Sequence, residues 1–311
     1  KDTGVAQDTQ TPDGGQDDDG GMPSDSMASD ATPSDTDEEG DSQGGSEDAS
    51  GDTSEDTAPC TLGQPQKVTG NIVLHPASQE VESGATLEKS RMWLSLAISA
   101  ISGSPDPLQQ DDMGVCKPAV EEFPSSTASM ESWGFDKVDV GSVMTGLVAF
   151  HDDQEGSSSD NFVRTATGIA GMSDVSSPVE DTTAFAVTKS TESALATAAG
   201  MSAGDLESKG FILGMFVDGN GDPVQGLKVA QISNGQGEPV AKAIYPSADF
   251  SSASTGKDAS TSANGIFLVP EASLGTWGGV EENKPDAAAV TTTQQGASSS
   301  GTAFTMTLVK Q

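Results

Sequence analysis

The first 59 residues contain no Leu, Ile, Phe, Tyr or Trp, and this absence limits what the segment can fold into. The same stretch holds 18 acidic residues against a single lysine, so its net charge is −17. Such a segment buries too little apolar surface to offset the entropy lost when its backbone is ordered. We therefore expect residues 1–59 to form a disordered acidic linker ahead of a folded part that starts near Cys60.

The rest of the chain is acidic as well, and the formal net charge of all 311 residues is −34. Binding to nucleic acid or to an anionic membrane surface depends on clustered Lys and Arg. We therefore expect no nucleic-acid partner, and an unknown protein or a glycan instead. The charge itself indicates solubility and self-repulsion.

The chain has features of an exported protein. No stretch approaches the roughly 18 apolar residues that span a bilayer. The sequence starts at Lys1 rather than Met, which indicates that an export signal, ending in a lipid-modified cysteine upstream, has been removed. We expect a bacterial lipoprotein-like chain in the periplasm or on the outer cell surface, with membrane contact only through such an anchor.

Cys60 and Cys116 are the only cysteines. In an exported protein such a pair most simply forms a disulfide. On the chain-entropy model, closing the long loop between them would contribute roughly 4 kcal/mol to stability. Two free buried thiols are the alternative.

After residue 60, short apolar runs are broken by turn residues, a pattern typical of a mainly β fold. We expect a β-rich domain over 60–160, with the alternative that it is a diverged copy of the sandwich that follows. A linker with short helices over 161–209 comes next, and a β-sandwich over 210–311 completes the chain. The expected architecture is an acidic tail followed by two β-sandwich-like domains with a helical connection.

Local signals support this division. Alanine-rich residues 192–200 predict a helix, and Ser202 and Asp205 have the spacing of a capping box for a second one that ends at Gly210. Residues 211–217 are apolar on both faces, as in a strand buried inside a sandwich.

Further signals lie closer to the end of the chain. Asn264-Gly265 predicts a hairpin turn before an apolar run. In the final predicted strand, Phe304 and Met306 lie on one face and Thr305 on the other.

Two motifs in the last region point to a family. The order Gly-x-x-Val-Asp-x-x-Gly-x-Pro-Val-x-Gly-x-x-Val runs from Gly214 to Val229, and Thr-Ser-Ala-Asn-Gly-Ile-Phe occupies residues 261–267. Together they resemble the opening and a later hairpin of carboxypeptidase regulatory-like domains, over about residues 210–270. The resemblance implies a transthyretin-like β-sandwich that has no catalytic residues of its own.

Asp218, Asn220 and Asp222 imitate the start of a calcium-binding loop. A helix–loop–helix calcium site needs Gly at its sixth position and Glu at its twelfth. Pro223 and Val229 stand there instead. The sequence therefore favours a hairpin turn, and a partial cation site is the alternative.

The histidines, His75 and His151, are too few for a typical zinc site and are expected in solvent-exposed loops. A hydrolase using His151 with the neighbouring carboxylates Asp152 and Asp153 is one alternative function. No dinucleotide-binding fingerprint or P-loop motif occurs. We therefore expect no cofactor and no enzymatic activity.

Exposed aromatic side chains can contact sugar faces, whereas buried ones pack a core. Trp93 and Trp133 are expected in the core. Trp277, which lies among glycines, is the best candidate for an exposed binding residue, and Tyr245 joins it in an adhesin that binds carbohydrate or protein. The leading prediction is a non-catalytic, exported or cell-surface-tethered structural or binding protein of unknown ligand.

Overall fold

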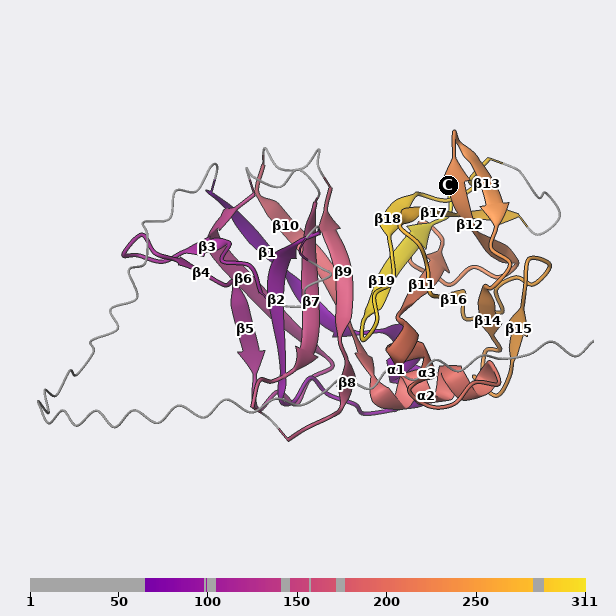
Figure 1. The fold of residues 1–311 in the computed structure, drawn as a ribbon, viewed down its shortest axis with the longest axis horizontal. Coiled ribbons are helices and arrows are strands. Elements are labelled where there is room, and N and C mark those ends of the chain that lie inside the picture. Colours follow the sequence, from indigo (N-terminus) through magenta and orange to yellow (C-terminus); the bar gives the residue numbers. More distant parts are fainter. Residues whose placement is uncertain are drawn as a thin grey trace, which may run out of the picture. The chain divides into compact units, whose positions relative to one another are not determined.

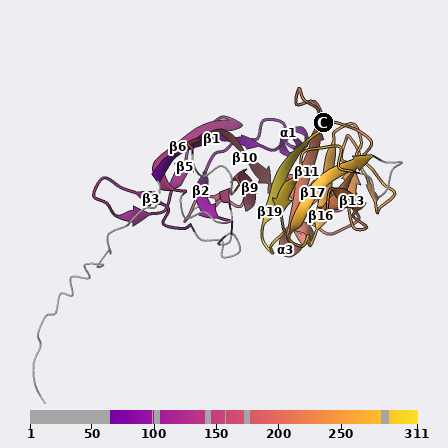
Figure 2. The same cartoon turned by 90° about the horizontal axis from the view of Figure 1, so that it is seen from above.

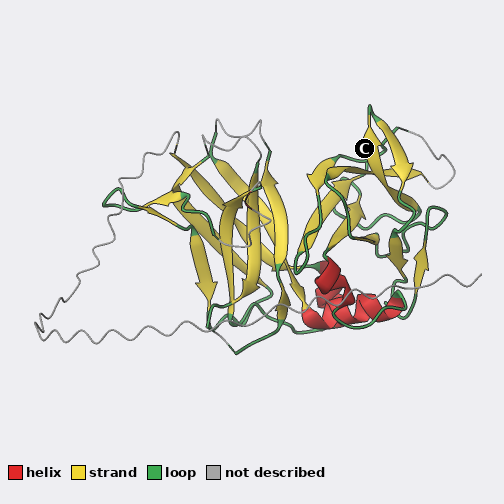
Figure 3. Ribbon diagram, in the orientation of Figure 1, coloured by secondary structure: helices red, strands yellow, loops and turns green. Residues whose placement is uncertain are grey.

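The computed structural model describes residues 65–97, 99, 105–140, 146–156, 158–171, 177–281 and 288–311. The predicted acidic linker and Cys60 lie outside these residues. All described residues belong to one compact unit, and strands dominate it (Figure 3). This confirms the mainly β fold class.

The first half of the described chain, up to about residue 188, contributes a six-stranded sheet in the order β4-β3-β6-β1-β10-β8. Its strands are β1 (Pro65–Leu74), β3 (Gln109–Gln110), β4 (Cys116–Lys117), β6 (Met130–Asp139), β8 (Phe162–Val163) and β10 (Val179–Thr188). β1 pairs antiparallel with β6 and parallel with β10. Alternate β1 residues, including Val68 and Ile72, are fully buried and face the core.

The second sheet has nine strands in the order β15-β14-β16-β11-β19-β9-β7-β2-β5. They are β2 (Ser90–Leu96), β5 (Val120–Phe123), β7 (Leu147–Asp153), β9 (Thr165–Ala170), β11 (Phe211–Val217), β14 (Ile244–Pro246), β15 (Ala253–Thr255), β16 (Ile266–Pro270) and β19 (Ala303–Val309). β19 lies between β9 and β11 and runs parallel to both (Figure 1). Strands from both halves of the chain therefore share one sheet.

The third sheet has the order β13-β12-β17-β18, formed by β12 (Leu227–Ser233), β13 (Gln236–Pro239), β17 (Gly275–Glu281) and β18 (Gln294–Gly296). It packs on the β16-β11-β19 part of the nine-stranded sheet around a core that includes Phe216, Phe267 and Trp277. Figure 2 shows β17 beside β11 and β16. This part of the chain is therefore a two-layered β-sandwich, and one of its layers continues into the strands of the first half.

A separate core lies between the six-stranded sheet and β2 and β7. Ile72 and Trp133 enter it from one sheet, and Leu94 and Ala149 from the other. The first half is therefore also a two-layered β structure, and its apolar residues alternate as the pleat requires.

Three helices occur among the described residues: α1 (Pro76–Val81), α2 (Lys189–Ala198) and α3 (Asp205–Lys209). They gather beside β11, as Figure 3 shows, where Leu195 of α2 shares a core with Phe211 and Leu213. None of these helices combines the length and apolarity that crossing a membrane would need.

The predicted capping box at Ser202 is only half formed. Asp205 accepts a hydrogen bond from the Ser202 N–H at 2.9 Å, and α3 begins after Gly204 without a side-chain cap of its own. The buried Glu192 carboxylate of α2 accepts the N–H groups of Gly204 and Leu206 instead, at 2.9 and 3.0 Å. A carboxylate at the positive end of a helix is favourable.

Two further sequence predictions need correction. The expected linker, 161–209, contains α2 and α3, but it also contains β8, β9 and β10, whose small and polar residues hid the strand pattern. The Asn264-Gly265 turn leads into β16 without forming a hairpin across it, because β16 pairs with β14 and β11.

Candidate functional site

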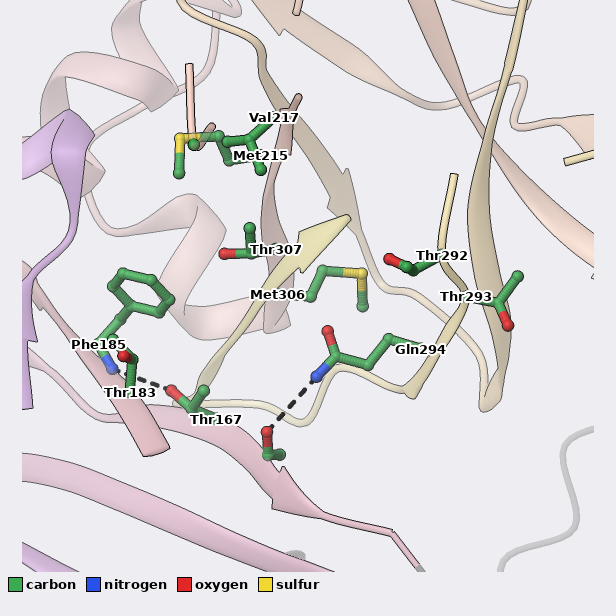
Figure 4. A pocket seen from close by; sticks show the side chains of 12 residues that line it. Thr167, Thr183, Phe185, Met215, Val217, Thr292, Thr293, Gln294, Met306 and Thr307 are labelled. Atoms are coloured by element: carbon green, nitrogen blue, oxygen red, sulfur yellow. Dashed lines mark hydrogen bonds between the residues drawn. The ribbon is translucent and has the colours of Figure 1, made fainter. Parts of the chain in front are cut away.

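A cleft of about 430 Å³ opens where β9 and β19 separate (Figure 4). One wall comes from β9 and β10, the other from β11 and β19, and the segment entering β18 closes one end. None of the residues that line the cleft carries a charge. Pockets of this size commonly hold small ligands.

The cleft exists because β19 is longer than its pairing with β9. The two strands are in register from Ala303 to Thr305, whereas β19 stays paired with β11 as far as Val309. At the last shared position, the hydroxyl oxygens of Thr167 and Thr305 lie 2.6 Å apart. Thr167 also accepts the Phe185 N–H of β10 at 3.1 Å, which holds the walls together at the base of the cleft.

Gln294 lies at the point of separation. Its Nε2 donates to the Gly168 carbonyl over 3.5 Å, which is longer than an ordinary N–H···O bond. Its Oε1 is buried and has no hydrogen-bond partner. A buried acceptor without a donor is unfavourable, so this oxygen would be stabilised by a ligand that brings an N–H or O–H group.

Apolar side chains line parts of the cleft, alongside five threonines. Phe185 is half-buried, and the edge of the His75 ring packs against it with 5.3 Å between ring centroids. Met215 and Met306 face the cleft from β11 and β19 (Figure 4). Methionine side chains are flexible and polarisable, so they adapt to ligands of different shape.

The prediction that Trp277 is exposed is wrong. Its side chain is 1% exposed, and its Nε1 donates to the Gly296 carbonyl at 2.9 Å. The adjacent Gly278 and Gly279 are close to Ile232 and Phe216, so the glycines make room for packing neighbours. The ring therefore has no free face for a sugar.

Tyr245 is likewise buried, with its hydroxyl oxygen accepting the Val229 N–H at 3.0 Å. Burial raises the pKa of this hydroxyl. Tyr245 belongs to β14 and to the sandwich core, so its ring has no exposed face for the ligand contact predicted from the sequence. Trp93 and Trp133 are buried, which confirms their predicted core role.

Asp218 organises the predicted turn. One of its carboxylate oxygens accepts the N–H groups of Asn220 and Asp222, at 2.8 and 3.0 Å. These two hydrogen bonds lower the pKa of Asp218, and the bond from the Asn220 N–H has the larger effect. A cation would compete with these amides, and no group of three or more His, Cys, Asp or Glu suited to a metal occurs in the part of the chain that the structure describes.

Neither histidine is in an exposed loop, so that expectation is wrong. His75 precedes α1 and its Nδ1 accepts the Ala77 N–H at 3.2 Å. His151, on β7, packs edge-on against Phe162, and both its ring nitrogens lack partners. Burial lowers the pKa of each histidine to about 3. His151 is 1% exposed, so it has no access to a hydrolase substrate.

Cys116 is half-buried on β4 and is not a free thiol. Cys60 lies outside the described residues, so the disulfide between them stays a prediction.

Sequence reasoning missed the cleft altogether. Thr167, Thr307 and Gln294 come from segments far apart in the chain, and each is an ordinary polar residue of a strand or loop. The alternation of Thr305 and Thr307 with buried Met306 was visible. That alternation does not indicate which strands pair with β19.

The sequence matches no protein-family model, and a comparison with curated proteins finds no match. Similar solved structures include a streptococcal ancillary pilin, with 13% identity, a TM-score of 0.21 and coverage of 79% of this chain and 69% of that chain. The Bacillus anthracis TIE protein has 8% identity and a TM-score of 0.20, and the match covers 79% of this chain and 34% of that chain. The shaft pilin SpaA from Lactobacillus rhamnosus GG has 10% identity and a TM-score of 0.19, and the match covers 80% of this chain and 98% of that chain. These TM-scores are too low to transfer fold or function.

Proposed function

We propose that this chain is a non-catalytic, exported protein of the periplasm or outer cell surface, and that it serves as a structural or binding module. Its acidic segment, residues 1–59, acts as a spacer that carries the sheets away from a surface. An anchor upstream of Lys1 would make the attachment. Residues 210–311 would be a transthyretin-like module of the kind that accompanies other domains.

The cleft at the separation of β9 and β19 carries the binding part of this proposal. It combines a buried, unpartnered Gln294 oxygen with a lining of threonine and apolar side chains and no charge. The histidines support the non-catalytic part, because each is 1% exposed and packs against a phenylalanine. An unknown protein or a glycan is the partner class.

The location is tested by expressing the complete native precursor in a bacterial host and treating intact cells with protease. We expect fragments of this chain to be released from intact cells or from spheroplasts, while a cytoplasmic marker stays whole. A chain that is protected until the cells are lysed would contradict the proposal.

The oxidation state of the cysteines gives a second test. Under non-reducing conditions, mass spectrometry of the exported chain should yield a peptide pair that joins Cys60 to Cys116. Reduced thiols in material taken from outside the cytoplasm would contradict the disulfide, because such compartments are oxidising.

A further inference from the structure

We propose that the cleft between β9 and β19 binds an uncharged peptide segment in the extended conformation. This inference rests on the proposed binding function and names the class of ligand. It follows from the strand edges that face the cleft, from the Gln294 amide and from the absence of charge.

The first observation is an open edge on β19. Successive residues of a strand direct their main-chain N–H and C=O groups to opposite flanks. Ala303 donates its N–H to the Arg164 carbonyl, and Val309 donates to Thr292, so odd-numbered residues face away from β11. Thr307 lies between them, beyond the pairing with β9, and its main chain therefore faces the cleft.

The opposite wall presents a second edge. The Ala186 carbonyl of β10 accepts the His75 N–H, whereas the Phe185 N–H turns away and donates to Thr167. Thr183 is two residues before Phe185 in an unbroken register with β1, so its main chain faces the same side as that of Phe185. Thr183 is exposed and lines the cleft.

The Gln294 amide occupies the position of a missing peptide group. Arg164 and Gly168 are four residues apart on β9, and the Arg164 carbonyl accepts an N–H from β19. The Gly168 carbonyl accepts instead from the Gln294 side chain, over 3.5 Å. A primary amide offers the same donor and acceptor as a peptide bond. A peptide could therefore replace the long Gly168 contact and donate its own N–H to Gln294 Oε1.

The walls also suit a peptide of particular composition. A charged side chain would lose its hydration there without an opposite charge to meet it. Phe185, Met215 and Met306 offer apolar contacts for alternate side chains of a strand, the usual source of specificity when a peptide adds to a sheet edge.

The test uses the full 311-residue chain against an array of acetylated, amidated octapeptides that contain no Asp, Glu, Lys or Arg. We expect selected peptides rich in Val, Thr and Leu to bind, with affinity measured by fluorescence anisotropy. Methylating alternate backbone nitrogens of the selected peptide should weaken binding at least tenfold, because the methyl groups remove main-chain donors.

Matched variants locate the site. Gln294→Ala should weaken binding at least tenfold, whereas Gln295→Ala, at the exposed neighbouring position, should leave it unchanged. Thr293→Trp should obstruct the mouth of the cleft, and Gln295→Trp serves as its control. Circular dichroism of every variant should match that of the parent chain, since residues 293 and 295 are both exposed.

The outcomes separate this inference from the proposed function. The inference is overturned if no uncharged peptide binds, if Gln294→Ala and Thr293→Trp both leave binding intact, or if a glycan array gives the only Gln294-dependent ligand. A chain that is released by protease from cells yet binds no peptide overturns the inference alone. A chain confined to the cytoplasm overturns the proposed function whatever it binds.

Discussion

The hydroxyl oxygens of Thr167 and Thr305 lie 2.6 Å apart, although 138 positions separate the two residues in the sequence. This hydrogen bond is at the last paired position between β9 and β19. Thr167 also accepts the Phe185 N–H, so three strands meet at one buried hydroxyl. The pair therefore fixes the base of the cleft.

Replacing Thr305 by Val tests the energetic value of this pair. The change keeps the side-chain shape but leaves the buried Thr167 hydroxyl with only its contact to the Phe185 N–H, and we expect a loss of about 1–2 kcal/mol in the free energy of unfolding. Urea titration followed by circular dichroism measures it. Thr307→Val, two residues along the same face and half-buried, should change stability by less than about 0.5 kcal/mol. Equal effects of the two substitutions would contradict this account.

Gly214 on β11 is predicted to tolerate no side chain. A Cβ at this position would overlap the Phe267 ring on the neighbouring strand β16. We expect Gly214→Ala to lower the free energy of unfolding by about 1–3 kcal/mol, as overpacking does in other cores. Gly219→Ala is the control, because its Cβ would meet open space. A Gly214→Ala chain as stable as the parent would show that the ring moves aside at no cost.

The stability of the chain should fall in acid partly through His151. Burial holds its pKa near 3, below the ordinary 6.5, so as the pH falls through this interval the unfolded chain binds a proton that the folded chain does not. The contribution of the neutral His151 ring to the free energy of unfolding is fully present above pH 6.5. It falls by about 1.4 kcal/mol for each pH unit below that value.

Comparing His151→Leu with the parent chain isolates this contribution. Between pH 7.5 and 5.0, the parent should lose about 2 kcal/mol more than the variant in the free energy of unfolding. Urea titrations at several pH values give the difference. Parallel stability profiles for the two chains would refute the assignment.

The Glu192 carboxylate is predicted to hold α3 in place. It is 1% exposed and accepts three main-chain N–H groups at the start of that helix, from Gly204, Leu206 and, over 3.4 Å, Glu207. Glu192→Gln removes the charge and substitutes a donor for one acceptor, so we expect a loss of about 1.5–3 kcal/mol. Glu88→Gln, at an exposed position, is the control. Hydrogen exchange of residues 204–209 should accelerate only in the Glu192 variant.

Much of the fold could be predicted because local pattern and burial agree. Residues 211–217 are apolar throughout, and the structure buries every one of them in β11. The alanine-rich segment forms α2, and Gly210, at φ 72°, follows α3. Phe304, Met306 and Leu308 alternate with threonines as the pleat of β19 requires.

What could not be predicted depends on contacts between distant segments. β9 has small and polar residues whose pattern does not reveal a strand paired on both flanks. The glycines around Trp277 suggested an exposed side chain, but they allow neighbouring side chains to cover the ring. The capping box could not reveal that a carboxylate from the preceding helix caps α3.

The position of β19 has a consequence for how the chain folds. β9 and β11 each keep one open edge until residues 303–309 arrive between them, and such long-range pairing slows folding. A chain still being synthesised or threaded through a translocation channel would therefore present two unsatisfied edges to its surroundings. Residues late in the sequence thus decide how long the chain remains vulnerable to aggregation.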